Sequence, residues 1–179
     1  MTSSHTNFHL IKSNRTRKLT FLAMFISLAM ILSVVETWIP LPVVIPGVKL
    51  GLANIITVLV ILKFGYKEAI IVVFLRCLLV SMLFGGPIIF LFSISGGLFS
   101  TLVMSLLFRF FGKTFSILGI SIAGSMAHNI GQIVVASIII GEAMIFTYLP
   151  ILLVAGIFTG VFVGLLSTFI NNSLKKLKM

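Results

Sequence analysis

The sequence of 179 residues contains no aspartate and a single cysteine, Cys77, and only 9% of its residues are charged. Without aspartate, the chain cannot form the aspartate clusters that hold divalent metal ions and diphosphate groups in many enzymes. One cysteine excludes a disulfide or a cysteine-ligated iron–sulfur cluster within the chain. A soluble domain has about 25% charged residues. The low charge, together with a hydrophobic content of 59%, predicts an integral membrane protein.

Six apolar segments have a length close to that needed for a membrane-spanning helix, which is about 20 residues. They cover residues 19–39, 50–64, 69–84, 88–111, 115–140 and 145–170. Glycine, proline and charged residues separate them, and these residue types end helices. The first segment has no small-residue cleavage site, so we expect it to be retained rather than removed as a signal peptide. The sequence therefore predicts an all-α bundle of six transmembrane helices at 19–171, between basic tails at 1–18 and 172–179.

The basic residues are distributed unevenly over this arrangement. Thirteen residues are Lys or Arg and three are acidic. Eleven of the thirteen lie on the side that carries both tails: Lys12, Arg15, Arg17, Lys18, Lys63, Lys67, Arg109, Lys113, Lys175, Lys176 and Lys178. The positive-inside rule places this side, and both termini, in the cytoplasm. The net charge then reflects topology and contact with anionic lipid. We expect no nucleic-acid partner, because no basic run is interleaved with stacking aromatic residues.

The two remaining basic residues are Lys49 and Arg76. Arg76 lies near the middle of the third segment, where a charge is costly unless it faces a cavity or a partner. It is either a ligand-binding residue or a structural arginine bonded to backbone carbonyls. Lys49 lies at the outer end of the second segment, with Asn54 about 7 Å deeper along the helix. Glu36 is within reach of Lys49 as a rim ion pair, and the start of the second segment offers backbone amides to an anion.

The fifth segment carries a polar stripe of His128, Asn129 and Gln132. The spacings of three and four place Gln132 on the same side as the other two residues. Gly124 and Gly131 flank the stripe and allow a ligand or another helix to approach closely. The stripe either lines a pocket or forms hydrogen bonds between helices. We expect no metal site, since the other two histidines lie in the N-terminal tail.

Small residues predict where helices pack against one another. Gly156, Gly160 and Gly164 form consecutive GxxxG steps in the sixth segment, and we expect them to pack inside the bundle. Ala23 and Ser27 form a similar step near the start of the first segment. This second step is either a packing contact or a docking face for a partner subunit.

Several of these motifs together resemble a known membrane family. They are residues 47–54 (GVKLGLAN), 75–76 (LR), 95–97 (SGG), 119–121 (GIS), 127–132 (AHNIGQ) and 148–150 (YLP). The family is that of the Gx transporters, also catalogued as heptaprenyl diphosphate synthase component I, and the resemblance covers about residues 19–170. The family is similar to the S components of energy-coupling factor vitamin transporters. This implies an S-component-like fold with six helices, cytoplasmic termini and an outward-facing ligand pocket.

The resemblance implies that the chain is a small-molecule binding or transport component in the bacterial cytoplasmic membrane. Its ligand-binding residues would be Lys49, Asn54, Arg76, His128, Asn129 and Gln132. Since the chain has no Walker A sequence, an ATP-driven energy-coupling module would be a separate partner. S components dock through an Ala-xxx-Ala motif, and Ala23 with Ser27 is the nearest match here.

Two other functions stay open. The resemblance implies a link to flavin-based extracellular electron transfer, in which the chain would bind a flavin or a quinone and have a flavoprotein or an extracytoplasmic electron-transfer partner. Alternatively, the chain is a non-catalytic membrane subunit associated with heptaprenyl diphosphate synthase or menaquinone biosynthesis. We expect no enzymatic activity of the chain itself, because it has neither an aspartate-rich prenyl synthase motif nor an ATPase motif. We also expect no intrinsic cofactor.

Overall fold

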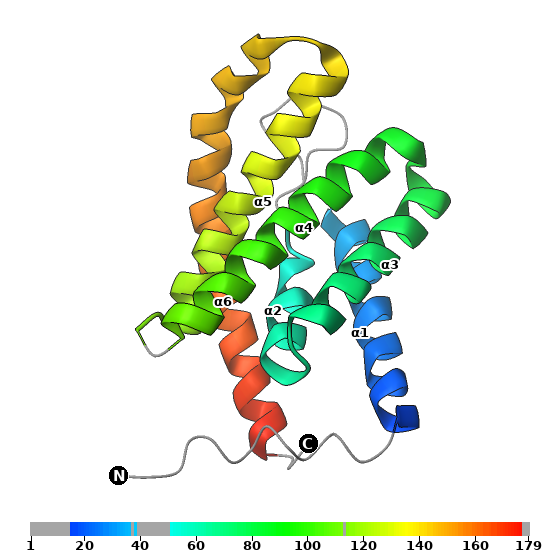
Figure 1. Ribbon diagram of the computed structural model, residues 1–179, viewed down its shortest axis with the longest axis vertical. Helices are drawn as coiled ribbons and strands as arrows, with labels where there is room; N and C mark the ends of the chain where they lie inside the picture. Colours follow the sequence, from blue (N-terminus) through cyan, green and yellow to red (C-terminus); the bar gives the residue numbers. More distant parts are fainter. Residues whose placement is uncertain (1–14, 37, 39–50, 113, 177–179) are drawn as a thin grey trace.

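The computed structural model describes residues 15–36, 38, 51–112 and 114–176. This part of the chain is helical and contains no strand, which confirms the predicted all-α class. The helices are α1 (Arg15–Glu36), α2 (Asn54–Lys63), α3 (Tyr66–Phe84), α4 (Gly86–Phe111), α5 (Ile117–Ile140) and α6 (Leu149–Lys176), with a short 3-10 helix, η2 (Ala143–Tyr148), before α6. Each of the six α-helices coincides with one of the predicted apolar segments. The start of α1 and the end of α6 lie at the same end of the bundle (Figure 1).

Four segments in the described part of the chain have the length and composition to cross a membrane. They are α1, α4, α5 and the continuous run of η2 and α6. The sequence predicts six spans, but α2 has only ten residues, or about 15 Å of the ~30 Å hydrocarbon core. α3 has 19 residues but includes three charged residues, Lys67, Glu68 and Arg76. The structure is therefore that of a multi-pass membrane protein in which two helices depart from an ordinary span.

The outer surface is apolar, as expected for contact with lipid. Large hydrophobic side chains on the long helices are exposed: Met82 on α3 by 75%, Ile138 on α5 by 74% and Phe158 on α6 by 73%. Large apolar side chains exposed over so much of the surface would be unfavourable in water. They are compatible with a hydrocarbon environment.

α5 and α6 form a tightly packed antiparallel pair, which lies side by side in Figure 1. A Cβ atom added at Gly160 would lie 2.5 Å from Ile122 Cα, and one at Gly164 would lie 2.7 Å from Leu118 Cα. The glycines of α6 thus face the α5 backbone one turn after another. The predicted internal packing of the GxxxG steps is confirmed.

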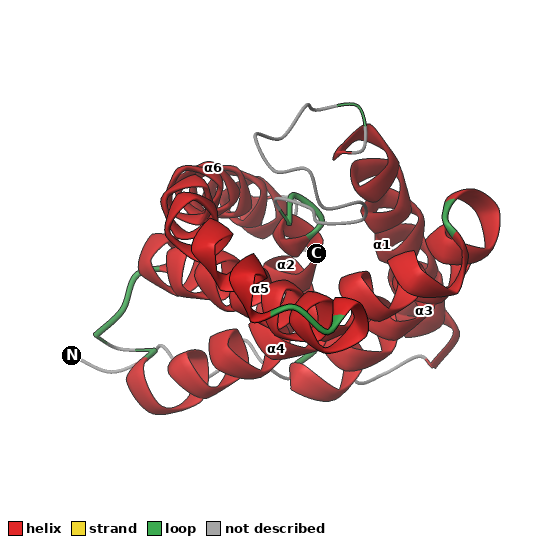
Figure 2. Ribbon diagram, turned by 90° about the horizontal axis from the view of Figure 1, so that it is seen from above, coloured by secondary structure: helices red, strands yellow, loops and turns green. Residues whose placement is uncertain are grey.

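The short helix α2 occupies the centre of the bundle. It contacts each of the other five α-helices, and eight of its ten residues are buried. In Figure 2, α2 lies between α1 and α6. The main hydrophobic core forms around α2, with Leu59 and Val60 almost fully enclosed. This central position explains why such a short helix is stable, since packing supplies what its length does not.

An ion pair joins the beginnings of α1 and α3, where Lys18 Nζ lies 2.5 Å from Glu68 Oε1. Glu68 precedes the apolar part of α3. Partial burial raises the pKa of Glu68, but its hydrogen bonds, above all the one from Lys18, and the positive charges of Lys18 and Lys67 together hold the pKa below its ordinary value of 4.5. The pair is largely accessible to solvent on the Lys18 side, where 39% of the side chain is exposed. It therefore contributes at most about 1 kcal/mol.

Candidate functional site

Two adjacent glycines of α4 form the centre of a buried polar site. A Cβ atom at Gly97 would lie 3.3 Å from Arg76 Nη2 of α3. A Cβ atom at Gly96 would lie 2.9 Å from His128 Cε1 and 2.8 Å from Gln132 Cγ of α5. The missing side chains thus let polar residues of two neighbouring helices reach the α4 backbone at successive positions. α4 itself continues as a helix through this point.

Arg76 is only 4% exposed and its guanidinium group is incompletely bonded. Nη1 donates a hydrogen bond to Ser33 Oγ of α1 over 3.0 Å. Nε and Nη2 have no hydrogen-bond partner among the described residues, and no carboxylate there pairs with Arg76. The alternative of a structural arginine bonded to backbone carbonyls is not supported, because no described carbonyl accepts a hydrogen bond from Arg76. A buried cation in this state strongly favours an added anion.

Asn54, the first residue of α2, is linked to α4 through Ser100. Ser100 Oγ of α4 donates a hydrogen bond of 3.3 Å to Asn54 Oδ1 and one of 3.1 Å to the Gly97 carbonyl. Asn54 Nδ2 has no hydrogen-bond partner in the described part of the chain. Gly51 has a φ of 89°, and a Cβ atom there would lie 2.9 Å from Asn54 Nδ2 and 3.2 Å from His128 Cδ2. Asn54 and His128 are thus neighbours across Gly51.

We call Ser33, Asn54, Arg76, Ser100, His128 and Gln132 the polar cluster. They come from five helices, and each is no more than 4% exposed. The sequence predicts an outward-facing pocket at these positions, whereas the structure shows the polar cluster closed. A ligand can reach it only when the surrounding elements move apart.

Two of the predicted ligand-binding residues are not part of the polar cluster as described. Asn129 Nδ2 donates a hydrogen bond of 2.6 Å to the Leu152 carbonyl of α6, so Asn129 joins α5 to α6. Consecutive residues of a helix point about 100° apart, which explains why His128 faces α4 while Asn129 faces α6. Lys49 lies outside the described residues. The structure thus brings together four of the six predicted residues.

Glu36 bonds to the backbone just before α2, and its predicted ion pair with Lys49 lies outside the described residues. It is 4% exposed, and its Oε1 atom accepts hydrogen bonds from the backbone amides of Gly51 and Leu52, the latter over 3.3 Å. These are among the amides that the sequence offers to an anion, so a protein carboxylate already occupies them. Sequence reasoning also missed Ser33 and Ser100. Serine is common on packed faces of membrane helices, so nothing in the pattern distinguishes these two from the others.

The small-residue motif predicted as a docking face, Ala23 and Ser27, lies on the outer face of α1. Ala23 and Ser27 are both exposed, and the Ser27 hydroxyl donates a hydrogen bond of 3.0 Å to the Ala23 carbonyl. The face is therefore open to lipid or to a partner in the described structure.

These features define the class of protein as a multi-pass α-helical membrane protein with a closed polar cluster at the centre of its bundle. The chain belongs to the heptaprenyl diphosphate synthase component I family, whose sequence model matches residues 25–170. This confirms the resemblance to that family, and the match includes α2 to α5 in full, parts of α1 and α6, and the whole polar cluster. No curated protein and no solved structure matched the chain. The similarity to energy-coupling factor S components stays a prediction.

Proposed function

We propose that the chain is a membrane-embedded binding component for a small anionic ligand, which Arg76 contacts within the polar cluster. The observation that carries the proposal is the state of Arg76, a buried guanidinium with two nitrogens that lack hydrogen-bond partners among the described residues. A ligand carboxylate or phosphate would supply the missing acceptors, and a guanidinium can bind either group through two parallel hydrogen bonds.

The neighbours of Arg76 suit an anion with several oxygen atoms. Asn54 Nδ2 is a second buried donor without a hydrogen-bond partner in the described part of the chain. His128 and Gln132 approach from α5 and would orient the rest of the ligand. Since all three acidic residues of the chain are glutamates and none pairs with Arg76 in the described structure, no protein carboxylate there competes with the ligand.

In the proposed arrangement, both termini lie in the cytoplasm and all six helices lie in the cell membrane. The cluster then opens toward the outside, as in an S component. A separate ATP-driven module, docked on the face that carries Ala23 and Ser27, would drive opening and release. The distribution of the basic residues supports this orientation, and the closed cluster supports a binding site that alternates between two states.

The test compares ligand-induced stabilisation of wild-type protein with that of an Arg76→Met variant in lipid nanodiscs. The panel consists of FMN, thiamine diphosphate, a quinone and heptaprenyl diphosphate. We expect an anionic member to raise the melting temperature of the wild type and not that of the variant. Arg109→Gln, which removes an exposed positive charge from α4, is the matched control and should respond like the wild type. An equal shift in the wild type and in Arg76→Met, or no binding by any member, would refute the proposal.

A second candidate function is that of a non-catalytic membrane subunit of a heptaprenyl diphosphate synthase. The family match over residues 25–170 favours it. Since the chain contains no aspartate, the aspartate-rich catalytic site would belong to another subunit. Gentle solubilisation and affinity purification separate the two functions. Recovery of a soluble prenyl synthase subunit favours this candidate, and recovery of an ATPase pair favours transport. Recovery of a flavoprotein would favour the electron-transfer function instead.

A further inference from the structure

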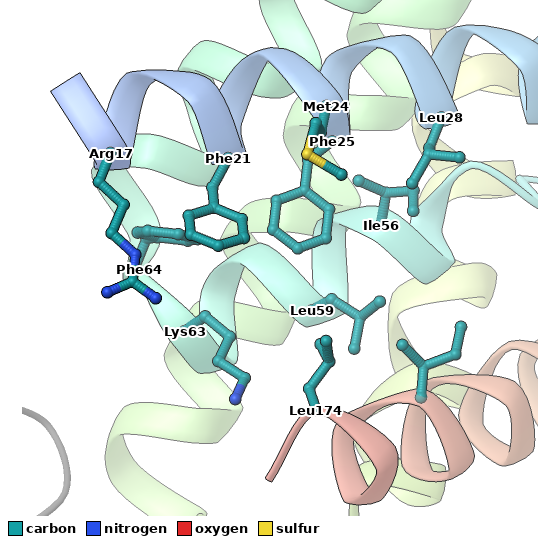
Figure 3. Close-up of a pocket in the computed structure, with 11 residues that line it drawn as sticks. Arg17, Phe21, Met24, Phe25, Leu28, Ile56, Leu59, Lys63, Phe64 and Leu174 are labelled. Atoms are coloured by element: carbon teal, nitrogen blue, oxygen red, sulfur yellow. The ribbon is translucent and has the colours of Figure 1, made fainter. Parts of the chain in front are cut away.

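A second site lies at the end of the bundle where α1 begins and α6 ends. Here α1, α2 and α6 line an apolar groove with a volume of about 190 Å³ (Figure 3). Met24 and Leu28 form its α1 side, Leu59 lies on α2 and Ile170 on α6. α2 contacts both α1 and α6 and contributes Ile56, Leu59 and Lys63 to the lining. It shares no residue with the polar cluster.

The two charged residues of the groove are cations, and they lie at one end of it. Figure 3 shows Arg17 and Lys63 together at one end, with Leu28 at the other. The Arg17 guanidinium lies over the Phe21 ring, 5.7 Å from its centroid, and makes no ion pair with another described residue. The groove is therefore amphipathic along its length, with a positive head region and an apolar tail region.

The length of the groove matches one leaflet of a bilayer. From Arg17 to Leu28 the α1 helix advances by eleven residues, or about 17 Å. Half of the hydrocarbon core is about 15 Å thick. With α1 across the membrane and Arg17 at the interface, the cations would lie at the level of the lipid head groups and the apolar part would reach to the middle of the membrane.

The distribution of charge in the groove favours a lipid as its occupant. Arg17 and Lys63 are the charged residues of the lining, and its other residues are apolar. A phospholipid has the matching arrangement, because its hydrocarbon chain bears no charge along its length and its phosphate lies at one end.

We propose that this groove binds one acyl chain of an anionic phospholipid, whose phosphate group lies between Arg17 and Lys63. The apolar lining holds the chain, and the two cations select an anionic head group over a zwitterionic one. The site is independent of the ligand proposed for the polar cluster.

The test is native mass spectrometry of the protein after release from nanodiscs that contain equal amounts of phosphatidylglycerol and phosphatidylcholine. We expect the wild type to retain one phosphatidylglycerol. The double variant Arg17→Gln, Lys63→Gln should lose about 30-fold in its preference for that lipid, given the usual effect of two cations near a membrane surface. The variant Lys67→Gln, Arg109→Gln removes the same charge from exposed positions outside the groove. It should keep the preference.

A second pair of variants tests the apolar part without changing charge. Met24→Trp fills the groove from a side chain that is 55% exposed, and Ile31→Trp places the same residue on α1 outside the groove, at a position that is 58% exposed. Only Met24→Trp should displace the bound lipid. The proposal is overturned if both charge variants retain the lipid equally, or if both tryptophan variants do. It is also overturned if a photocrosslinker at position 24 captures a polypeptide instead of a lipid in native membranes.

Discussion

The contact between α5 and α6 allows a sharp prediction for Gly160→Ala. The new Cβ atom would lie 2.5 Å from Ile122 Cα and 3.1 Å from Ile122 N, whereas ordinary contacts begin at 3.4 Å. Both opposing atoms belong to the backbone of a helix, so no side-chain rotation can relieve the overlap. The two helices must separate locally by about 1 Å, judged from these distances.

The expected magnitude combines two opposing effects. Overpacking of this kind typically costs about 1–3 kcal/mol and occasionally more, and the rigid backbone contact places Gly160→Ala at the upper end of that range. Replacing glycine by alanine inside a helix recovers about 1 kcal/mol of helix propensity. The free energy of unfolding should therefore fall by about 2 kcal/mol. Separation of the helices would also lengthen the Asn129 hydrogen bond to α6, which lies about two turns away.

The assay is reversible unfolding in mixed micelles with increasing SDS, followed by circular dichroism. Gly119→Ala is the matched control, because it lies in α5 and its added Cβ atom would meet only the Phe115 ring, at 3.2 Å, and a more distant serine hydroxyl. A ring can rotate away, so this variant should be neutral or slightly more stable than the wild type. If Gly160→Ala proved as stable as Gly119→Ala, the close helix contact inferred here would be wrong.

Three further variants have measurable outcomes. Asn129→Ala should lower the free energy of unfolding by about 0.5–2 kcal/mol because it removes the bond between α5 and α6, without changing binding at the polar cluster. Ser33→Ala should increase anion affinity in a binding titration, because it leaves the Arg76 guanidinium with no remaining hydrogen-bond partner among the described residues. Glu68→Gln should cost less than about 1 kcal/mol at pH 7. Since the folded-state pKa of Glu68 is lowered, this difference should be present above pH 4.5 and disappear as the pH falls through the folded-state pKa.

The helices and the packing of α6 could be predicted because they depend on local sequence. Groups of glycine, proline and charged residues separate the apolar runs, while single glycines such as Gly124 lie inside helices, and each apolar run coincides with one helix of the structure. Gly156, Gly160 and Gly164 recur every four residues, which places them on one side of α6 whatever their partner is. The partner itself, α5, follows from a short connection that leaves the two helices adjacent and antiparallel.

The composition of the polar cluster could be predicted only in part, because it depends on helix rotation. Arg76 and Asn54 are conspicuous as polar groups in apolar runs, and the structure buries both. The spacing of the polar residues could not show which helix Asn129 contacts. His128 and Asn129 are consecutive, so the polar stripe is wide enough to face two helices at once. The hydrogen bond from the Gly51 amide to Glu36 could not be predicted, because it depends on how the chain folds back.

The shortness of α2 explains both sites. A helix that crossed the whole membrane would begin at the surface, with its first residues exposed. α2 is about half that length and is enclosed by the other helices, so it begins with Asn54 already inside the bundle, next to His128. Its opposite end is Lys63, which lines the apolar groove together with residues of α1 and α6. The polar cluster therefore includes the first residue of this short helix, and the apolar groove runs along one side of the helix from Ile56 to Lys63. The positive charge of each site belongs to a neighbour of α2 or to its last residue.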